Sequence, residues 1–296
     1  MIFVAGKQGQ VALSLEEAAG TRNLTLSTHG RPVLDLLDPA ATKDAVLAAS
    51  PAAIINAAAY TAVDQAESEE DLATRINADG AAALAAAAAE LGVPFIHIST
   101  DYVFDGTKDA PYVESDPVAP TGAYGRSKLK GEQSVLKANP SAIIVRTAWV
   151  YSPFGKNFLK TMLALAGRDT LSVVADQHGN PTYAPDIANA LLDILAQLDG
   201  HVPTADKAGI YHLAGTGFTN WHGFAQSIFE NGAGFGLPVP DVKAISTAEY
   251  PTPAKRPANS RLDCDKLNVN FGVSLPNWRE STAECVKRLS EMGELG

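Results

Sequence analysis

The sequence predicts an α/β protein, in which a doubly wound parallel sheet of the Rossmann type is followed by a smaller C-terminal substrate lobe. Short runs of apolar and β-branched residues alternate with helical patterns through the first half of the chain. A glycine-containing turn follows the first run, and Pro and Gly become frequent after about residue 151. Because apolar runs separated by helices indicate buried strands, they favour parallel pairing with right-handed crossovers.

The expected strands are short and apolar, and a helical segment follows each of the first four. The strands are expected at residues 2–6, 24–28, 53–56, 95–99 and 143–145. The helices are expected at residues 10–20, 39–50, 67–91 and 124–138. Asp38 followed by Pro39 is typical of a helix start, and Gly20 is typical of a helix end.

The chain divides into two expected lobes. Residues 1–150 read as a dinucleotide-binding lobe and residues 151–296 as a substrate-binding lobe. Segments near 171–198 and 209–213 are expected to return to the first lobe, because they contain further strand and helix patterns.

Composition excludes several classes of function. The 296 residues include 33 acidic and 23 basic side chains, a net charge of −10, so no nucleic-acid partner is expected. The two cysteines and six histidines show no metal-ligand spacing. The N-terminus lacks the pattern of a signal peptide, and no apolar run reaches the roughly 20 residues that span a bilayer. We therefore expect a cytoplasmic protein without a membrane partner.

The first turn has the spacing GxxGxxA, with Gly6 and Gly9 ahead of Gln10, Val11 and Ala12. Glycine allows the backbone to approach a pyrophosphate, and a helix N-terminus supplies N–H donors with partial positive charge. The pattern differs from GxGxxG, so by itself it also fits an ordinary strand-to-helix turn. Its place at the start of an α/β pattern favours dinucleotide binding.

Arg31 indicates which dinucleotide is bound. An acidic residue that would bind a ribose 2′-hydroxyl is missing after the second expected strand, where the sequence is Thr28-His29-Gly30-Arg31. Because Arg pairs well with a 2′-phosphate, NADP(H) is favoured over NAD(H). A solvated surface arginine is the alternative.

Two polar segments make the most informative combination. Tyr124 and Lys128 are four residues apart on an expected helix and therefore share a face, where a nearby cation would lower the pKa of the phenol. Thr100 and Asp101 follow the fourth expected strand. Because ligands bind beyond the carboxyl ends of parallel strands, these four side chains are candidates for one catalytic site.

With these motifs, the sequence resembles the extended short-chain dehydrogenase/reductases, and within them the dTDP-4-dehydrorhamnose reductase family. The segments that carry the resemblance are residues 6–11, 56–67, 99–106, 124–128, 146–151, 211–215 and 250–262. The resemblance implies NADPH-dependent reduction of the C4 ketone of dTDP-4-dehydro-6-deoxy-L-mannose to dTDP-L-rhamnose.

The resemblance also implies roles for individual residues. Tyr124 would donate a proton to the C4 alkoxide, Lys128 would hold the nicotinamide ribose, and Thr100 would bind the ketone oxygen. Asp101 would orient the sugar, and Trp149 would pack on it. The implied cofactor contacts are Gly9, Gln10 and Val11 at the pyrophosphate, Asp35 and Leu36 at the adenine, and Ala59, Tyr60 and Thr61 between them.

Residues outside this set have weaker assignments. Asn77 lies where relatives place a supporting asparagine, although a solvated helix residue is an equal alternative. Arg261 is the first candidate for binding the nucleoside diphosphate, with Lys255 and Arg256 behind it, because an acidic protein needs local positive charge for such a ligand.

Two alternatives to the reductase stay open at this stage. A nucleotide-sugar epimerase or dehydratase would share Tyr124 and Lys128 but keep its NAD, and a non-catalytic protein, such as a regulatory subunit of methionine adenosyltransferase, would use the same fold. Some family members form a dimer around Mg²⁺. Ser14 and Pro185 stand at the matching positions, which disfavours Mg²⁺ and leaves open whether the protein is a monomer or a homodimer.

Overall fold

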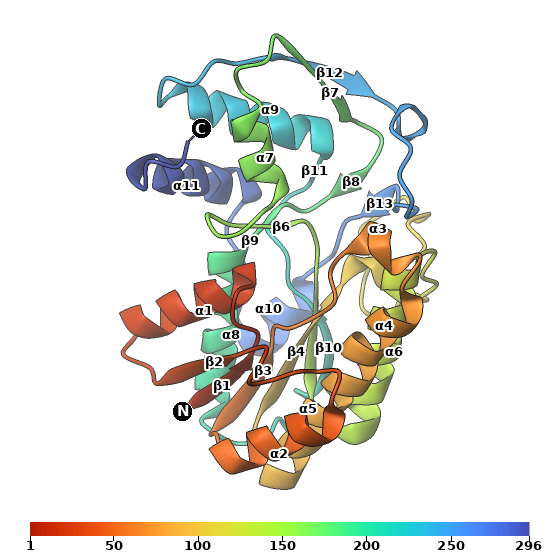
Figure 1. Ribbon diagram of the computed structural model, residues 1–296, viewed down its shortest axis with the longest axis vertical. Coiled ribbons are helices and arrows are strands. Elements are labelled where there is room, and N and C mark those ends of the chain that lie inside the picture. The colour runs from red at the N-terminus through yellow and green to blue at the C-terminus, as the bar shows by residue number, and fades with distance from the viewer. Residues whose placement is uncertain (296) are drawn as a thin grey trace.

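A six-stranded parallel sheet forms the centre of the larger lobe. The computed structural model describes residues 1–295, and Figure 1 shows this sheet below a second, smaller lobe. The strand order is β10-β5-β4-β3-β1-β2, and all neighbours are parallel. The strands are β1 (Ile2–Ala5), β2 (Leu26–His29), β3 (Ala53–Asn56), β4 (Phe95–Thr100), β5 (Ile143–Thr147) and β10 (Gly209–His212). This confirms the expected doubly wound α/β class.

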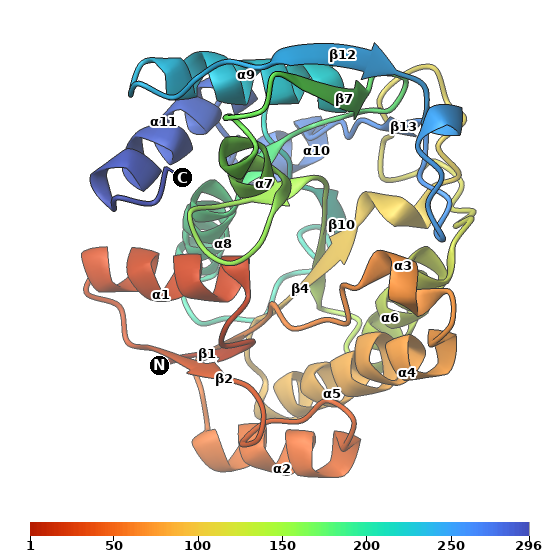
Figure 2. The same ribbon diagram turned by 45° about the horizontal axis from the view of Figure 1, so that its top comes forward.

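Helices cover both faces of the sheet, which explains why its strands read as continuous apolar runs. On one face lie α1 (Gln10–Thr21), α8 (Ala184–Leu198) and α10 (Asp265–Phe271). On the other face lie α2 (Pro39–Ala49), α5 (Ala81–Leu91) and α6 (Ala123–Ala138). Figure 2 shows α1 and α2 on opposite sides of β1 and β2.

The expected long helix at residues 67–91 is wrong in detail, because the structure divides this region. It contains α4 (Glu70–Thr74), the π-helical turn η1 (Arg75–Gly80) and α5, and the short helix α3 (Val63–Ala66) precedes it. A π-helical turn widens the backbone locally and often lies at a functional site. Here it brings Asn77 to the Tyr60 backbone and to α6, whose Gly131 has no side chain to collide with the Asn77 carbonyl oxygen.

The second lobe has a separate core of aromatic and aliphatic side chains. Its helices are α7 (Phe158–Ala164), α9 (Trp221–Ala233) and α11 (Trp278–Glu291). Its strands form three small sheets from β6 (Val150–Tyr151) and β9 (Thr182–Tyr183), from β7 (Thr170–Val174) and β12 (Asp241–Ile245), and from β8 (His178–Gly179), β11 (Thr219–Asn220) and β13 (Asn259–Ser260). Two 3₁₀ turns, η2 (Asp101–Val103) and η3 (Thr247–Glu249), complete the elements.

Part of the second half of the chain returns to the large sheet. Strand β10 pairs with β5, and α8 packs against α1. The early part of 171–198 differs, because β7 pairs with β12 in the second lobe. Within residues 1–295, no helix has the length and apolar character needed to cross a membrane.

Candidate active site

A continuous groove runs across the carboxyl ends of the parallel strands. It consists of two adjoining cavities of about 410 and 510 Å³. The smaller one contains Arg31, Asp35 and Leu36, and the larger one contains Tyr124 and Lys128. The residues common to both walls are Gln8, Gly9, Ala57, Ala58, Ala59 and Thr61. An elongated ligand can therefore extend from one cavity into the other.

The glycine turn at the centre of the groove fits a dinucleotide pyrophosphate. Gly6 has φ of +125°, and a Cβ atom there would lie 3.3 Å from the carbonyl carbon of Ala57. Gly9 is the N-cap of α1, and within the described chain no side chain caps this helix. The first N–H groups of α1 are thus free to bind an anion, which is the arrangement that nucleotide folds use.

The Gln10 side chain contacts the protein, whereas its backbone N–H is the group expected at the pyrophosphate. Its Oε1 accepts hydrogen bonds from Ser152 Oγ at 2.8 Å and from Asn157 Nδ2 at 3.0 Å. Gln10 therefore ties the nucleotide turn to the loop that leads into the second lobe. The expected contact of residue 10 with a pyrophosphate is left to its backbone N–H.

The smaller cavity contains the groups expected near an adenosine. Arg31 is exposed on its wall, together with Lys7 from the glycine turn. Leu36 is buried, and Asp35 accepts a hydrogen bond from the backbone N–H of Leu37 at 3.0 Å. This end of the groove offers two cations to a ligand and an apolar surface to a base.

The middle of the groove is formed by the loop after β3. Ala59 and Thr61 lie in its wall, whereas the Tyr60 phenol donates to Glu69 Oε2 at 2.8 Å. The structure thus brings Ala59 and Thr61 to the groove and engages the Tyr60 side chain elsewhere. Asn77 fixes the loop by accepting from Tyr60 N at 2.8 Å and donating to Tyr60 O at 3.1 Å. This buried residue is a structural support, not a solvated helix residue.

Thr100 and Asp101 lie in the wall of the larger cavity, at the end of β4 and the start of η2. Thr100 Oγ1 donates to Asp101 Oδ1 at 2.9 Å, and Asp101 Oδ2 has no hydrogen-bond partner among the residues that the structure describes. Burial raises the pKa of Asp101 to about 6, although hydrogen bonds from Ser260 and Thr100 oppose this. A buried acceptor without a partner is suited to a hydroxyl group of a ligand.

Tyr124 and Lys128 lie in the wall of the same cavity, on the first turns of α6. Helix α6 lies so close to η2 that a Cβ atom at Gly125 would collide with the Tyr102 carbonyl oxygen, so the absence of a side chain at Gly125 allows this approach. The pKa of Tyr124 is raised by burial and then by the negative charge of Asp101, while a hydrogen bond with Thr100 lowers it. The expected lowering by Lys128 is therefore wrong for this state, and the phenol is fully protonated at neutral pH.

Lys128 is buried and makes two polar contacts with β4. Its Nζ donates to the Ile98 carbonyl oxygen at 2.7 Å and lies 3.4 Å from His97 Nε2. Burial lowers the pKa of Lys128 to about 8, and the negative charge of Glu132 opposes this. The proton of this lysine is thus lost close to physiological pH.

Trp149 forms one wall of the catalytic cavity and is held in an unusual backbone conformation. Its φ is +48°, and its indole stacks on Trp221 with ring centroids 3.6 Å apart and planes 10° apart. A side chain at Gly179 would collide with the Trp149 ring. Trp221 in turn forms part of a separate, largely apolar cavity of about 360 Å³. No local sequence pattern indicates Trp221, because its partner Trp149 is 72 positions away.

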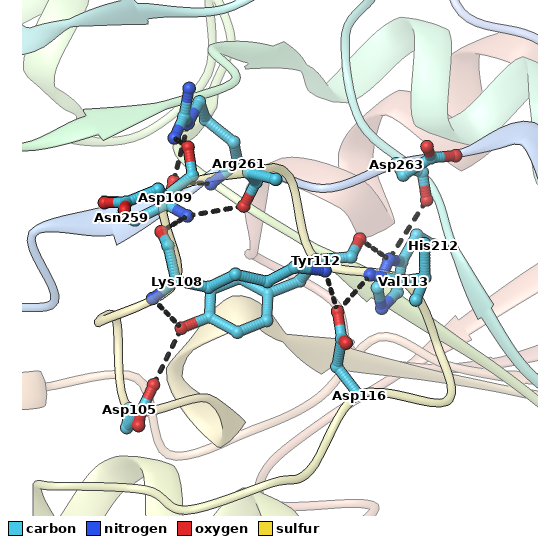
Figure 3. Close-up of polar contacts among 11 residues, drawn as sticks. Asp105, Lys108, Asp109, Tyr112, Val113, Asp116, His212, Asn259, Arg261 and Asp263 are labelled. Atoms are coloured by element: carbon cyan, nitrogen blue, oxygen red, sulfur yellow. Dashed lines mark hydrogen bonds and ion pairs between the residues drawn. The ribbon is translucent and has the colours of Figure 1, made fainter.

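Arg261 is engaged elsewhere within the part of the chain that the structure covers, as Figure 3 shows. Its Nε donates to Asn259 Oδ1 at 2.7 Å, and its Nη2 donates to the carbonyl oxygen of Asp109. The guanidinium also lies 5.1 Å from the ring centroid of Phe218. Arg256 lies instead in the wall of the apolar cavity, where it pairs with Asp64 at 2.8 Å.

Ser14 and Pro185 lie on α1 and at the start of α8, the two helices that pack together. The Ser14 hydroxyl donates to the Gln10 carbonyl oxygen at 2.8 Å. In residues 1–295, no cluster of three His, Cys, Asp or Glu side chains is arranged to hold a metal ion.

Comparison with known proteins agrees with this geometry. A model of the RmlD substrate binding domain family matches residues 1–291. The chain is 51% identical to the dTDP-4-dehydrorhamnose reductase of Sinorhizobium fredii over 289 residues, which is 96% of each chain. It is 42% identical to the reductase of the same name from Salmonella typhimurium, over 94% of each chain.

Solved structures give the same result. A crystal structure of a dTDP-4-dehydrorhamnose reductase from Clostridium acetobutylicum has a TM-score of 0.90 and 38% identity, covering 98% of this chain and 99% of that one. The reductase of that name from Bacillus anthracis, in complex with NADP, has a TM-score of 0.88 and 35% identity, covering 97% and 98%. The protein therefore belongs to the RmlD substrate binding domain family of extended short-chain dehydrogenase/reductases.

Proposed function

We propose that the protein reduces the C4 ketone of dTDP-4-dehydro-6-deoxy-L-mannose to dTDP-L-rhamnose with NADPH, in the cytoplasm. One observation carries this proposal. Tyr124, Lys128, Thr100 and Asp101 lie in the wall of one cavity, which continues into the groove at the N-terminus of α1. This arrangement supports the roles of Tyr124 as proton donor and of Lys128 as a cation at the nicotinamide end of a dinucleotide site.

The side chains support reduction in the following way. When bound, NADPH supplies the hydride that adds to C4. Thr100 turns its hydroxyl proton from Asp101 Oδ1 to the ketone oxygen, Tyr124 donates a second hydrogen bond to it, and Tyr124 gives up its proton as negative charge forms there. The Lys128 ammonium stabilises the resulting phenolate and binds the ribose hydroxyls. The product is the C4 alcohol, with one hydride and one proton added to the ketone.

The structure also supports a place for the nucleotide portion of the substrate. The stacked indoles of Trp149 and Trp221 lie between the catalytic cavity and the separate apolar cavity, where Tyr250 offers a second aromatic surface. Arg256 lies in the same wall, where a nucleoside diphosphate would compete with the Asp64 carboxylate for its guanidinium. We assign the thymine to this cavity, and we propose that the diphosphate displaces Asp64 from Arg256, because Arg261 is held by Asn259 and Asp109.

Turnover of the purified protein tests this function. NADPH oxidation is followed with dTDP-4-dehydro-6-deoxy-L-mannose and, separately, with its uridine counterpart, and the product is identified by NMR. We expect dTDP-L-rhamnose from the first substrate and slower turnover of the second. A sugar-nucleotide product without net NADPH oxidation, together with NAD that stays bound through gel filtration, would assign the protein to the epimerases or dehydratases.

A further inference from the structure

Behind the catalytic lysine, three buried polar side chains from two strands and one helix contact one another in series. Asn56, at the end of β3, contacts His97 of β4, and His97 contacts Lys128 of α6. Asn56 and His97 are each 1% exposed, and Lys128 is 2% exposed, so water does not compete for these contacts. The direction of each hydrogen bond is therefore set by the protein alone.

The backbone at Ala58 fixes that direction. The Ala58 N–H, which can only donate, points at Asn56 Oδ1 at 3.1 Å. The other end of the amide, Nδ2, is therefore turned toward His97 Nδ1 at 2.9 Å. Because Nδ2 is a donor, Nδ1 of His97 must accept and carries no proton.

It follows that the neutral imidazole carries its proton on Nε2. Burial and then the charge of Lys128 keep the pKa of His97 well below its usual value, so the ring stays neutral. Nε2 lies 3.4 Å from Lys128 Nζ, and its N–H thus faces the amine. An imidazole in this tautomer offers the ammonium group no acceptor.

We propose that His97 is a positioning residue for the reduction. Its ring turns an N–H toward Lys128, so His97 accepts no hydrogen bond from the ammonium and leaves the lysine N–H bonds available to the cofactor and Tyr124. This inference rests on the proposed function for its catalytic meaning. A lysine ammonium has three N–H bonds, and in the described structure the Ile98 carbonyl oxygen accepts one of them. With no lone pair on Nε2, the other two remain for the ribose hydroxyls and the Tyr124 phenolate.

None of the other charged groups near Lys128 in the described structure contacts its ammonium directly, so they do not mask the effect of the His97 tautomer. Glu132 lies one turn further along α6, but its carboxylate is bound by Arg146 of β5 at 2.7 and 2.8 Å and by Ser99 of β4 at 2.6 Å. Tyr124 on α6 and Asp101 on η2 face the same cavity. The direct polar contacts of the lysine are with the Ile98 carbonyl and His97, so the tautomer of His97 decides how well the ammonium form is stabilised.

The first test reads the tautomer directly, without substrate. Long-range ¹H–¹⁵N NMR of ¹⁵N-histidine-labelled protein should show a neutral ring at pH 7 with Nε2 protonated, at a signal that disappears in His97→Phe. A proton on Nδ1, or a charged imidazolium, would overturn the inference. This measurement does not depend on which sugar nucleotide the enzyme uses.

The second test changes the tautomer with a nearly isosteric substitution. In Asn56→Asp, one carboxylate oxygen still accepts from Ala58 N–H, and the other accepts from His97 Nδ1, so Nε2 presents its lone pair to Lys128. We expect the ¹³Cε titration of Lys128 and the alkaline limb of kcat/KM to move to higher pH by about half a pH unit or more. The Kd of NADPH should rise, because the lysine now gives an N–H to His97.

His97→Phe removes the ring N–H without adding an acceptor. We expect the Lys128 titration to move in the same direction, by a smaller amount, while the Kd of NADPH changes little. Asn56→Asp in the His97→Phe background isolates the effect of the added charge, and we expect it to move the titration less than in the wild type. An equal movement in both backgrounds would overturn the inference.

His201→Phe in an exposed loop is the matched control and should leave the titration and the pH profile unchanged. The outcomes also separate the two proposals. Failure of the wild type to turn over the sugar nucleotide, with the tautomer and titration results as expected, would count against the proposed function alone. If neither variant folds, the tautomer of the wild type still decides the inference.

Discussion

Asn77 hydrogen-bonds both backbone groups of Tyr60, accepting from its N–H at 2.8 Å and donating to its carbonyl oxygen at 3.1 Å. Its Nδ2 also donates to Ser127 Oγ at 2.9 Å, on the turn of α6 between Tyr124 and Lys128. One buried amide thus joins the cofactor loop to the catalytic helix. This is possible because η1 has the wider π-helical turn.

Replacing Asn77 should therefore affect both stability and cofactor binding. Asn77→Ala leaves the N–H and carbonyl of Tyr60 without partners, which we expect to cost about 1–3 kcal/mol of unfolding free energy in urea denaturation. Because Ala59 and Thr61 lie in the groove wall on either side of Tyr60, the KM for NADPH should also rise. An unchanged KM in a destabilised variant would limit Asn77 to a structural role.

Tyr124→Phe tests the proton donor. We expect kcat to fall by at least about 10²-fold, because the C4 alkoxide loses its proton source, while the Kd of NADPH stays within a few fold of the wild type. Steady-state kinetics and cofactor titration measure the two quantities. Tyr102→Phe is the matched control, since its ring packs edge-on against Tyr124 at 5.5 Å. Equal losses in both variants would contradict the assigned role.

Asp101 should make the stability of the protein depend on pH. Its pKa is about 6 in the folded state, above the value of 3.8 in an unfolded chain. The folded state therefore binds more protons between these values, and stability is lost as pH rises through about 6. Asp101→Asn cannot ionise, so we expect it to be more stable than the wild type at pH 8.

The stability gain of Asp101→Asn should shrink as the pH is lowered toward 4, where the wild-type carboxyl is also neutral. Urea unfolding at pH 5 and pH 8 measures this difference. Activity should fall at pH 8, because a sugar hydroxyl loses its carboxylate acceptor, and it should fall less at pH 5, where the wild-type carboxyl is mostly neutral. A stability gain that is the same at both pH values would show that Asp101 is not the group responsible.

A buried ion pair behind the site should be important for stability. Arg146 donates to Glu132 through Nε at 2.8 Å and Nη2 at 2.7 Å, and both side chains are 2% exposed. Glu132→Gln leaves the guanidinium charge unpaired in the core, with an expected loss of about 3–5 kcal/mol. Glu70→Gln, in the exposed pair with Arg126, should cost under about 1 kcal/mol in the same denaturation experiment.

Arg31 should decide the preference between the two dinucleotides. If it binds the 2′-phosphate, Arg31→Ala should raise the KM for NADPH by about 10-fold or more and leave the KM for NADH nearly unchanged. Kinetics with both cofactors measure the ratio. Arg168→Ala, at an exposed position in the second lobe, provides the control. A parallel rise in both KM values would show that Arg31 does not recognise the 2′-phosphate, and Lys7 in the same cavity would then be the candidate for that contact.

The local sequence was sufficient for the fold class and for most of the candidate residues that line the groove. Gly6, Gly9, Tyr124 and Lys128 could be found because turn geometry and helix periodicity depend on neighbours within a few positions. Thr100 was found in a similar way, from its place at the end of a buried strand. The break in the expected 67–91 helix was missed, because it depends on how closely α6 approaches η1.

The remaining features depend on segments that meet only in the folded chain. His97 reads as an ordinary strand residue until Asn56 and Lys128 lie on either side of it, and Arg261 reads as a phosphate ligand until Asn259 and Asp109 engage it. Burial also reversed the expected direction of the Tyr124 pKa. The sequence by itself determined which segments carry the candidate site residues and their order along the chain, namely a nucleotide turn, a hydroxyl-bearing strand end and a Tyr-x-x-x-Lys helix. Only the tertiary structure decided hydrogen-bond direction and desolvation, because both depend on groups distant in sequence and on the exclusion of water.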